Sequence, residues 1–393
     1  MSQDPIVIVG MARTPMGGLL GDLSTVPASE LGAIAIRGAL KSAGIEADTV
    51  NETVMGCVLP AGQGQAPARQ ASRKAGIPDG TGAVTVNKMC GSGMQAMMQA
   101  HDSLVAGSRK VVVAGGMESM SLAPHLLPSG RTGVKYGNAQ VLDHMALDGL
   151  TDAYAGEPMG VFAELCAERY QFTRDAQDAY AIESLKRAQR AIEDGSFDDE
   201  VVPVTVKSRR GDVEVSTDEQ PPKARLDKIP GLRPAFKKDG TVTAANASSI
   251  SDGAAALVMM RQSEAKERGL TPLAVLRAHA DHAQAPEWFT TAPVKAIQNV
   301  LDKAGWSVGD VDLFEVNEAF AVVAMAAIHE LALDHDKVNV NGGACALGHP
   351  IGASGARICV TLINALKKRG LKRGVASLCI GGGEATAVAI ELV

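Results

Sequence analysis

The sequence predicts an α/β fold built from two similar halves. Short apolar runs alternate with alanine-rich stretches of helical spacing, which is the pattern that alternating strands and helices produce. A faint internal repeat, in which turn, helix, strand and glycines follow one another twice, indicates the two halves. The chain has 393 residues, of which 46% are hydrophobic, so it is long enough to bury two cores.

The first elements can be placed by local signals. Residues 6–9, Ile-Val-Ile-Val, are predicted to form a buried strand. Residues 27–43 have helical spacing, and Gly44 is the expected end of that helix. Residues 111–114, Val-Val-Val-Ala, are predicted to form another strand, closed by the glycines at 115–116.

The middle of the chain contains a long helix followed by an unusual segment. Thr173 is the predicted N-cap of a helix that runs to about residue 194, with Gly195 beyond its end. Residues 207–240 contain four prolines, and nine basic residues face five acidic ones between 207 and 238. Two interpretations stay open: a solvated surface excursion, which charge alone favours, or a lobe that offers Lys and Arg to a phosphate-bearing ligand.

The internal repeat places two loops in equivalent positions. In the first half, residues 86–93 lead into a helix, then the strand at 111–114 and its glycines. In the second half, residues 340–355 lead into a helix, then a strand at 375–380 and the glycines at 381–383. Two similar halves related by a pseudo-twofold axis would bring these loops together, so residues distant in sequence could form one site.

Composition excludes several classes of function. The net charge of −6 argues against general nucleic-acid binding. No apolar run reaches the length that crosses a bilayer, and the first ten residues lack the features of a secretion signal, so a cytoplasmic location is expected. The six cysteines include no CxxC pair, which favours reduced thiols in a reducing compartment. Histidines and cysteines lack metal-ligand spacing, so no metal site is predicted.

Cys90 is the first candidate for chemistry. It lies in Asn-Lys-Met-Cys-Gly-Ser-Gly, between a strand and a helix whose apolar residues recur at helical spacing. Unpaired N–H groups and the dipole of a helix N-terminus favour a thiolate and predict a lowered pKa for this thiol. A buried, inert cysteine is the competing interpretation. His101 falls on the apolar stripe of the same helix and is predicted to be a core histidine.

Three further residues stand in unusual surroundings. His349 lies among glycines in the segment at 341–355, where packing does not explain a histidine, and histidine is the usual base for activating a thiol. Its alternative role is to cap a turn. Cys379 ends an apolar strand, and Asn317 stands between a short strand and an apolar helix. Taken alone, Cys379 would be a core cysteine and Asn317 an N-cap.

Together these segments resemble the thiolase family. The resemblance covers nearly the whole chain, from Val-Gly-Met-Ala-Arg-Thr-Pro at 9–15 to the C-terminal glycines, with four motifs in the family's order. It implies a five-layer αβαβα fold of two halves, at residues 1–270 and 271–393, with a loop domain at about 119–250 inserted in the first half. Family members are usually dimers or tetramers, so a homo-oligomer, such as a homotetramer, is expected.

The resemblance also implies a role for each candidate residue. Cys90 matches the acylated nucleophile and His349 the base that activates it. Cys379 matches a second acid/base, which acts on the α-carbon of the incoming acetyl-CoA. Asn317 matches the residue that, with His349, positions a water in a first oxyanion hole. The backbone N–H groups of Cys90 and Gly381 match a second oxyanion hole.

These roles describe acetyl-CoA C-acetyltransferase activity by a ping-pong route. Transfer of an acyl group to carbon is easier when the acyl group is first bound covalently to a sulfur atom. Removal of a thioester α-proton needs a base and groups that stabilise the enolate. Coenzyme A is then a substrate and product, and no cofactor is expected. The order Cys-Gly-Ser-Gly at 90–93 resembles the biosynthetic branch, which favours acetoacetyl-CoA as the product.

The substrate pocket is matched by position. Ser248 matches a residue that touches the pantetheine arm, and Met159 and Phe320 match residues that line the acyl pocket. Two departures border that pocket: Pro158 stands where many biosynthetic thiolases carry histidine, and Phe289 where some relatives have methionine. Both bear on the preference for acetyl groups and leave the core chemistry intact. Because coenzyme A carries phosphates, the resemblance favours the interpretation of the basic residues at 207–238 as a phosphate-binding site.

Three alternatives remain. A degradative 3-ketoacyl-CoA thiolase would prefer longer acyl chains. A ketosynthase loading from a carrier protein would pair its cysteine with two histidines, whereas the third group here is Cys379. A non-catalytic CoA- or lipid-binding protein on a thiolase scaffold could lose one of the four groups, and all four are intact.

Overall fold

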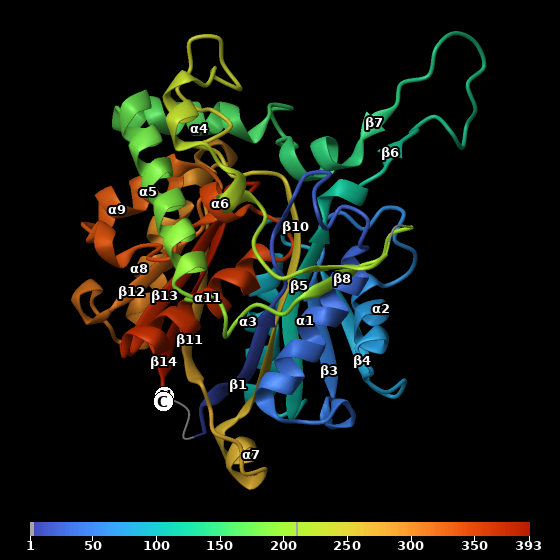
Figure 1. Cartoon of the computed structure of the whole chain (residues 1–393), viewed down its shortest axis with the longest axis vertical. Coiled ribbons are helices and arrows are strands. Elements are labelled where there is room, and N and C mark those ends of the chain that lie inside the picture. The colour runs from blue at the N-terminus through green and yellow to red at the C-terminus, as the bar shows by residue number, and fades with distance from the viewer. Residues whose placement is uncertain (1–3, 210) are drawn as a thin grey trace.

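A sheet of ten strands organises the fold (Figure 1). The computed structural model describes residues 4–209 and 211–393. The strand order is β12-β13-β14-β11-β1-β10-β5-β3-β4, and β2 pairs with β10. The strands are β1 (Ile6–Arg13), β2 (Gly17–Gly18), β3 (Glu52–Gly56), β4 (Gly82–Val86), β5 (Val111–Ser119), β10 (Ser251–Arg261), β11 (Ala274–Ala283), β12 (Leu313–Val316), β13 (Arg373–Ile380) and β14 (Glu384–Leu392).

Strand β1 lies at the junction of the two parts of the sheet. It pairs with β10 along most of its length but with β11 only at Val7 and Ile8. Its side chains alternate between two cores: Ile6 and Ile8 enter one cluster, and Val7 and Val9 enter another. A continuous apolar run is therefore required here, because both faces of this strand are buried.

Helices cover both faces of the sheet. Helices α1 and α2 pack on the part that contains β1, β3 and β5, and α8 and α9 pack on the part that contains β11 to β14. The α-helices outside the segment between β5 and β10 are α1 (Ala28–Ala43), α2 (Pro67–Lys74), α3 (Ser92–Val105), α7 (Gln262–Glu267), α8 (Ala292–Ala304), α9 (Ala321–Leu331), α10 (Ala344–Leu347) and α11 (Ser354–Arg369).

The sheet folds around α3 and α11. Helix α11 contacts both β12 and β5, which are six strands apart in the sheet order. Six strand spacings amount to about 29 Å in a flat sheet, whereas a helix with its side chains is only about 10–12 Å wide. The two parts of the sheet must therefore face each other across α3 and α11. With the outer helices this makes five layers, in the order αβαβα, as predicted.

The segment between β5 and β10 contains further helices and short strands outside the large sheet. A long excursion between β6 and β7 extends away from the body of the molecule (Figure 1). The elements of this segment are β6 (His125–Leu126), β7 (Leu142–Asp143), α4 (Met159–Tyr170), α5 (Arg174–Glu193), β8 (Val204–Val206), β9 (Val213–Val215) and α6 (Gln220–Lys223). Short 3₁₀ or π turns across the whole chain are η1 (Ala47–Thr49), η2 (Met120–Leu122), η3 (Met145–Leu150), η4 (Leu226–Gly231), η5 (Pro286–Thr291), η6 (Val308–Asp310) and η7 (His335–Lys337).

The predicted helix signals are confirmed. Gly44 adopts a left-handed conformation with φ of 67° at the end of α1, where a residue without Cβ is unstrained. Thr173 caps α5, since its hydroxyl accepts a hydrogen bond from the backbone N–H of Ala176 at 3.1 Å. In the described part of the chain, no helix combines the length and the apolar character that crossing a bilayer requires.

The predicted end of the strand at 111–114 is wrong. Strand β5 continues through Gly115 and Gly116 to Ser119. A side chain on Gly116 would place its Cβ 2.0 Å from the carbonyl oxygen of Gly352. These glycines are therefore required by close backbone approach rather than by a turn, and sequence alone does not separate the two uses of glycine.

Candidate active site

The N-termini of α3 and α11 lie side by side. A Cβ atom on Gly355 would lie 2.4 Å from the backbone nitrogen of Met94, and one on Gly93 would lie 2.8 Å from that of Ala356. Only glycines allow the two helices to begin this close together. The loops that precede them, which carry Cys90 and His349, are thereby held next to each other, as the internal repeat predicted.

Cys90 lies in a strained turn between β4 and α3. The preceding residue, Met89, has φ of 45°, an uncommon conformation for a residue with a side chain. Cys90 is half-buried and packs against a cluster that includes Ile351, two residues beyond His349. The backbone N–H of Gly381 donates a hydrogen bond to the thiol, so the glycine turn after β13 reaches the same point.

The predicted lowering of the Cys90 pKa is wrong. Burial raises the pKa of this thiol to about 11, although the backbone N–H groups of Gly381 and of Cys90 itself act in the opposite direction. Desolvation penalises the thiolate more than these donors favour it. The resting thiol is therefore protonated at neutral pH and needs a base.

His349 is held in one orientation and one tautomer. Its Nδ1 atom lies 2.6 Å from the hydroxyl oxygen of Ser354, and that hydroxyl donates to the carbonyl oxygen of Pro350 at 3.0 Å. Because the hydroxyl proton is directed to Pro350, the Ser354 oxygen accepts a hydrogen bond from Nδ1–H of His349. The Nε2 atom is left with its lone pair and lies 3.5 Å from the amide nitrogen of Asn317.

The His349 imidazole is neutral at rest. Burial lowers its pKa to about 3, and the positive charge of Arg357 contributes in the same direction. A neutral imidazole whose Nε2 lone pair makes only a long contact, with the Asn317 amide, is in the state that can accept a proton. The turn-capping interpretation of His349 does not account for this lone pair, and the backbone N–H of His349 donates to Ser249, which lies outside the turn.

Asn317 follows β12 directly and is not an N-cap. Helix α9 begins at Ala321, and the residue at its N-cap position is Phe320. The backbone N–H of Asn317 donates to Ser377 of β13 at 3.0 Å, which fixes its position beside that strand. Among the described residues, no group pairs with its buried side-chain oxygen. Its amide nitrogen is the group that faces His349.

The neighbouring residue, Glu318, anchors the glycine-rich loop that leads to His349. Its fully buried carboxylate accepts hydrogen bonds from the Ser184 hydroxyl at 2.8 Å, the Asn339 amide at 2.8 Å and the Cys345 backbone N–H at 3.0 Å. Tyr180 donates a fourth at 3.0 Å. This carboxylate therefore ties α5 and the loop to the residue next to Asn317, a role that sequence reasoning missed.

A second buried carboxylate holds the other side of the site. Glu118, at the end of β5, accepts hydrogen bonds from the backbone N–H groups of Val58 and Gly352, both at 2.9 Å. Burial raises its pKa to about 7, and the backbone donors offset part of that rise. Its contact with Gly352 fixes the loop between His349 and α11. Glu118 was not predicted, because an acidic residue within an apolar strand carries no positional signal of its partners.

Cys379 lies deep in β13 and close to Cys90. Its side chain is 1% exposed, and burial raises the pKa of its thiol well above the ordinary value. A negative charge on Cys90 would raise that pKa further. The turn that follows Cys90 meets the end of β13, since a Cβ atom on Gly91 would collide with the side chain of Ile380. Both cysteines therefore stand beside the Gly381 turn, and the interpretation of Cys379 as an isolated core cysteine does not account for this neighbour.

The predicted pocket residues gather around Cys379. Met159, Phe289 and Phe320 belong to one apolar cluster with this cysteine. Ser248 lies beside this cluster, because its backbone N–H donates a hydrogen bond to the carbonyl oxygen of Ala319, a member of the cluster, at 2.9 Å. Phe236 was not predicted: its ring packs edge-on against Phe320, with centroids 6.0 Å apart. Phe236 is 38% exposed and lies in the proline-rich segment, where no periodic pattern identifies the residues that contact the pocket.

The basic segment at 207–238 borders this region. A cavity of about 340 Å³ is lined by the basic residues Lys223, Arg225 and Lys228 and also by Ala245 and Cys345. Lys223 pairs with Asp22 and Glu219, and Arg225 pairs with Asp227. In the described ranges, no carboxylate pairs with Lys228.

Comparisons with known proteins agree with this geometry. Residues 6–263 match the family model for the thiolase N-terminal domain, and residues 270–392 match that for the thiolase C-terminal domain. Acetyl-CoA acetyltransferase from Cupriavidus necator is 50% identical over 98% of this chain and 99% of that protein. Acetyl-CoA acetyltransferase 2 from Arabidopsis thaliana is 51% identical over 99% and 97%. The crystal structure of Acat5 thiolase from Ascaris suum, in complex with coenzyme A, superposes with a TM-score of 0.94 at 42% identity, over 99% of this chain and 100% of that one.

Proposed function

The chain belongs to the thiolase family, and from this premise we propose that it is an acetyl-CoA acetyltransferase. The reaction joins two acetyl-CoA molecules into acetoacetyl-CoA and free coenzyme A, and it is reversible. Relatives of that name from a bacterium and a plant share half of their residues with this chain over nearly the full length. The observation that carries the proposal is the convergence of two equivalent loops, which hold Cys90 and His349, with the end of β13, which holds Cys379.

In the first half-reaction, acetyl-CoA acylates Cys90. Nε2 of His349 takes the thiol proton as the sulfur attacks the thioester carbonyl carbon. The bond from carbon to the coenzyme A sulfur breaks, and Cys379 gives its proton to that sulfur. Burial of the Cys379 thiol keeps it protonated at rest, which suits it to this acid role. Free coenzyme A leaves, and the products are acetyl-Cys90, an imidazolium and a Cys379 thiolate.

In the second half-reaction, a new carbon–carbon bond forms. The Cys379 thiolate removes a proton from the methyl carbon of a second acetyl-CoA, and the enolate attacks the carbonyl carbon of acetyl-Cys90. The Cys90 sulfur leaves and regains its proton from His349. Two oxygens become negative in this step, that of the enolate and that of the attacked acetyl group. The water positioned by Asn317 and His349 serves as one oxyanion hole, and the backbone N–H groups of Cys90 and Gly381 serve as the other. Every group returns to its starting state without a resident cofactor, and coenzyme A acts only as substrate and product.

Labelling with radioactive acetyl-CoA tests the nucleophile. The native protein should carry one acetyl group, and Cys90→Ala should carry none. Cys359→Ala, which removes a buried thiol from the middle of α11, is the matched control and should label like the native protein. Labelling of Cys90→Ala would place the nucleophile elsewhere. No labelling of the native protein, together with no thiolysis of acetoacetyl-CoA, would favour a non-catalytic CoA- or lipid-binding protein.

The size of the acyl group is tested by thiolysis rates on 3-ketoacyl-CoA substrates of four, eight and sixteen carbons. The walls around Cys379 are bulky: Phe289 is 2% exposed and packs against Phe320 with ring centroids 6.4 Å apart. We expect the rate to fall as the chain lengthens, because a longer chain must displace these rings. A rate that rises with chain length would instead support a degradative 3-ketoacyl-CoA thiolase.

The cavity beside Lys228 fits the phosphate-bearing end of coenzyme A. Its basic residues would bind the phosphates. Ala245 and Cys345 also line the cavity, and they belong to the segments that carry Ser248 and His349. Lys228→Ala should raise KM for acetyl-CoA but leave the rate with S-acetyl-N-acetylcysteamine, which has no phosphate, unchanged. Lys238→Ala removes an exposed lysine of the same segment and should change neither. Equal effects of Lys228→Ala on both substrates would contradict this assignment.

A homo-oligomer, as a dimer or a homotetramer, and a cytoplasmic location complete the proposal. Family resemblance supports the oligomer, and six free cysteines support a reducing compartment, since the reaction uses two of them as thiols. Sedimentation of the purified protein measures the oligomeric state, and fractionation of cells measures the location.

A further inference from the structure

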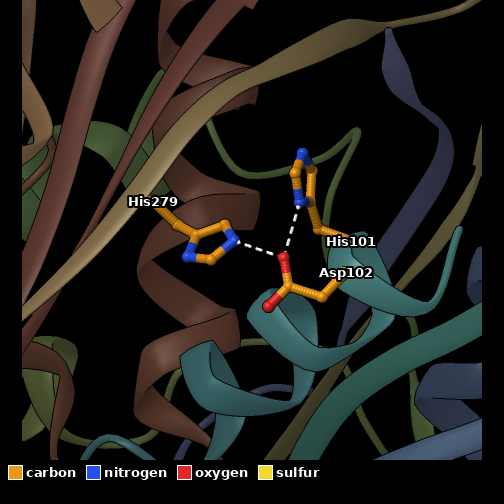
Figure 2. Close-up of side chains that lie close together, drawn as sticks. All are labelled: His101, Asp102 and His279. Carbon is orange, nitrogen blue, oxygen red and sulfur yellow. Dashed lines mark hydrogen bonds and ion pairs between the residues drawn. The ribbon is translucent and has the colours of Figure 1, made fainter. Parts of the chain in front are cut away.

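A cluster of three side chains lies on the surface between the two halves of the molecule. His101 and Asp102 lie on the last turns of α3, and His279 lies on β11 (Figure 2). Both rings point toward the carboxylate of Asp102, whose Oδ1 atom lies 3.1 Å from Nδ1 of His101 and 2.9 Å from Nε2 of His279. The two rings meet edge to face, with centroids 4.9 Å apart.

His101 was predicted to be a core histidine, and the structure places it at the edge of the core. Its side chain is 19% exposed, that of His279 is 17% exposed and that of Asp102 is 65% exposed. On the last turn of α3, Leu104 remains buried, whereas Asp102 and Val105 are exposed. The three groups are thus supported by packing on one side and open to water on the other.

The spacing of the three ligand atoms suits a single metal ion. All of them lie within 4.8 Å of one another. In a tetrahedral zinc site with bonds of about 2.0–2.1 Å, ligand atoms are about 3.3 Å apart. Two of the three pairs are already near that separation, and a small rotation of one ring would bring the two nitrogens closer. An ion would take the place of the two hydrogen bonds that now converge on Asp102.

We propose that His101, Asp102 and His279 bind a divalent transition-metal ion of the zinc class. Two imidazoles and one carboxylate form a donor set that favours zinc and its neighbours over magnesium or calcium, which prefer oxygen ligands. The exposed side of Asp102 leaves room for water to complete the coordination. Sequence spacing predicted no metal site, because His279 is 177 residues from Asp102 and only the fold brings them together.

The position of the site gives the ion a structural role. Helix α3 begins directly after Cys90, and β11 is the first strand of the second half. A bound ion would link the far end of α3 to that strand and so fasten the two halves together. It would lie at the opposite end of α3 from Cys90, so it would stabilise the fold without taking part in acyl transfer. This inference does not depend on the proposed reaction.

The test is the binding of Zn²⁺ and Co²⁺ to chelator-treated, full-length protein. Equilibrium dialysis should show one Zn²⁺ bound per chain, and Co²⁺ should give visible ligand-field bands without the intense near-ultraviolet band of thiolate ligands. That second readout separates this site from binding at Cys90 or Cys379. The ion should also raise the thermal unfolding temperature, because it binds only the folded state.

Three variants complete the test. His279→Ala and Asp102→Asn should each lower Zn²⁺ affinity by more than the roughly 10–100-fold loss that follows removal of a group outside the ligand set. Asp102→Asn keeps the size of an exposed side chain and should leave folding intact. His282→Ala, on the same strand and outside the cluster, should bind Zn²⁺ like the native protein. Native protein that binds no Zn²⁺, or His279→Ala and Asp102→Asn that bind it as tightly as the native protein, would overturn the proposal.

Discussion

Removal of the Ser354 hydroxyl should disable His349 without touching the substrate. In the native structure the Ser354 oxygen accepts a hydrogen bond from Nδ1–H of His349 at 2.6 Å and donates one to Pro350. This pair of bonds keeps the lone pair of the imidazole on Nε2, the atom beside Asn317. In Ser354→Ala the buried Nδ1–H loses its partner. The ring can then rotate or carry its proton on Nε2, where it cannot accept the thiol proton.

The size of the effect follows from the hydrogen bond that is lost. An unpaired buried donor costs about 1–3 kcal/mol. If that cost falls on the transition state, in which the imidazole carries a positive charge, kcat falls about 5- to 150-fold, since about 1.4 kcal/mol is a factor of ten. KM should change little, because Ser354 contacts His349 and Pro350 rather than the proposed substrate pocket.

The assay is the thiolysis of acetoacetyl-CoA, followed by the loss of substrate absorbance, with kcat and KM measured across pH. Ser72→Ala is the matched control: it removes one buried serine hydroxyl, which lies 3.0 Å from the hydroxyl of Thr53 beneath α2. Ser72→Ala should lose stability on the same scale and keep its kcat. The reasoning fails if Ser354→Ala keeps a kcat within twofold of the native protein, or if its loss of activity equals that of Ser72→Ala.

Three further predictions use the buried charges and thiols. Because the pKa of Cys90 is about 11, alkylation of this thiol by iodoacetamide should accelerate about tenfold per pH unit through pH 9, and a plateau near neutral pH would contradict it. His349 has a folded-state pKa of about 3 against about 6.5 when unfolded, so its contribution to stability is complete above pH 6.5 and falls by about 1.4 kcal/mol per pH unit below it. Urea unfolding at two pH values should therefore show a shallower acid loss for His349→Asn than for the native protein, and equal slopes would disprove it. Arg13→Met leaves Glu200 and Asp218 buried without their partner, at 2.6 and 2.7 Å in the native protein, and should lower the free energy of unfolding by about 3–5 kcal/mol; a loss under about 1 kcal/mol would show that the carboxylates find other partners.

Local sequence signals were enough for several elements, and the resemblance to the thiolase family supplied the layered fold. The apolar run at Ile6, the cap at Thr173 and the left-handed end at Gly44 each depend on a few neighbouring residues, and each is found as predicted. The repeat carried the longer-range information, since two equivalent loops must meet across a pseudo-twofold axis. The glycines of β5 misled the prediction because distant backbone requires them: Gly115 approaches Ala255, and Gly116 approaches Gly352, more than two hundred residues away.

The parts of the site that sequence reasoning missed are those defined by partners in space. Ser354 lies only five residues after His349, but its role depends on a hydroxyl proton directed to Pro350. Glu118 and Glu318 accept hydrogen bonds from backbone N–H groups of distant loops. Nothing in the sequence around either residue identifies those partners. A buried acidic residue in an apolar stretch is nevertheless a usable signal, because such a carboxylate must be satisfied by several donors.

The sign of the Cys90 pKa shift changes how the proposed chemistry must begin. A helix N-terminus and the Gly381 N–H favour the thiolate, but burial dominates, and burial also keeps His349 neutral. Before substrate binds, a pair of Cys90 thiolate and His349 imidazolium would place two charges in a site that disfavours both. The acetyl-enzyme does hold such a pair, the His349 imidazolium and the Cys379 thiolate, until the second acetyl-CoA gives its proton to Cys379. The proton must therefore move from Cys90 to His349 as the thioester carbonyl is attacked, when the developing charge passes to an oxygen with hydrogen-bond donors beside it. A thiol that stays protonated until substrate arrives is also protected from oxidation and alkylation, because only the thiolate is an effective nucleophile.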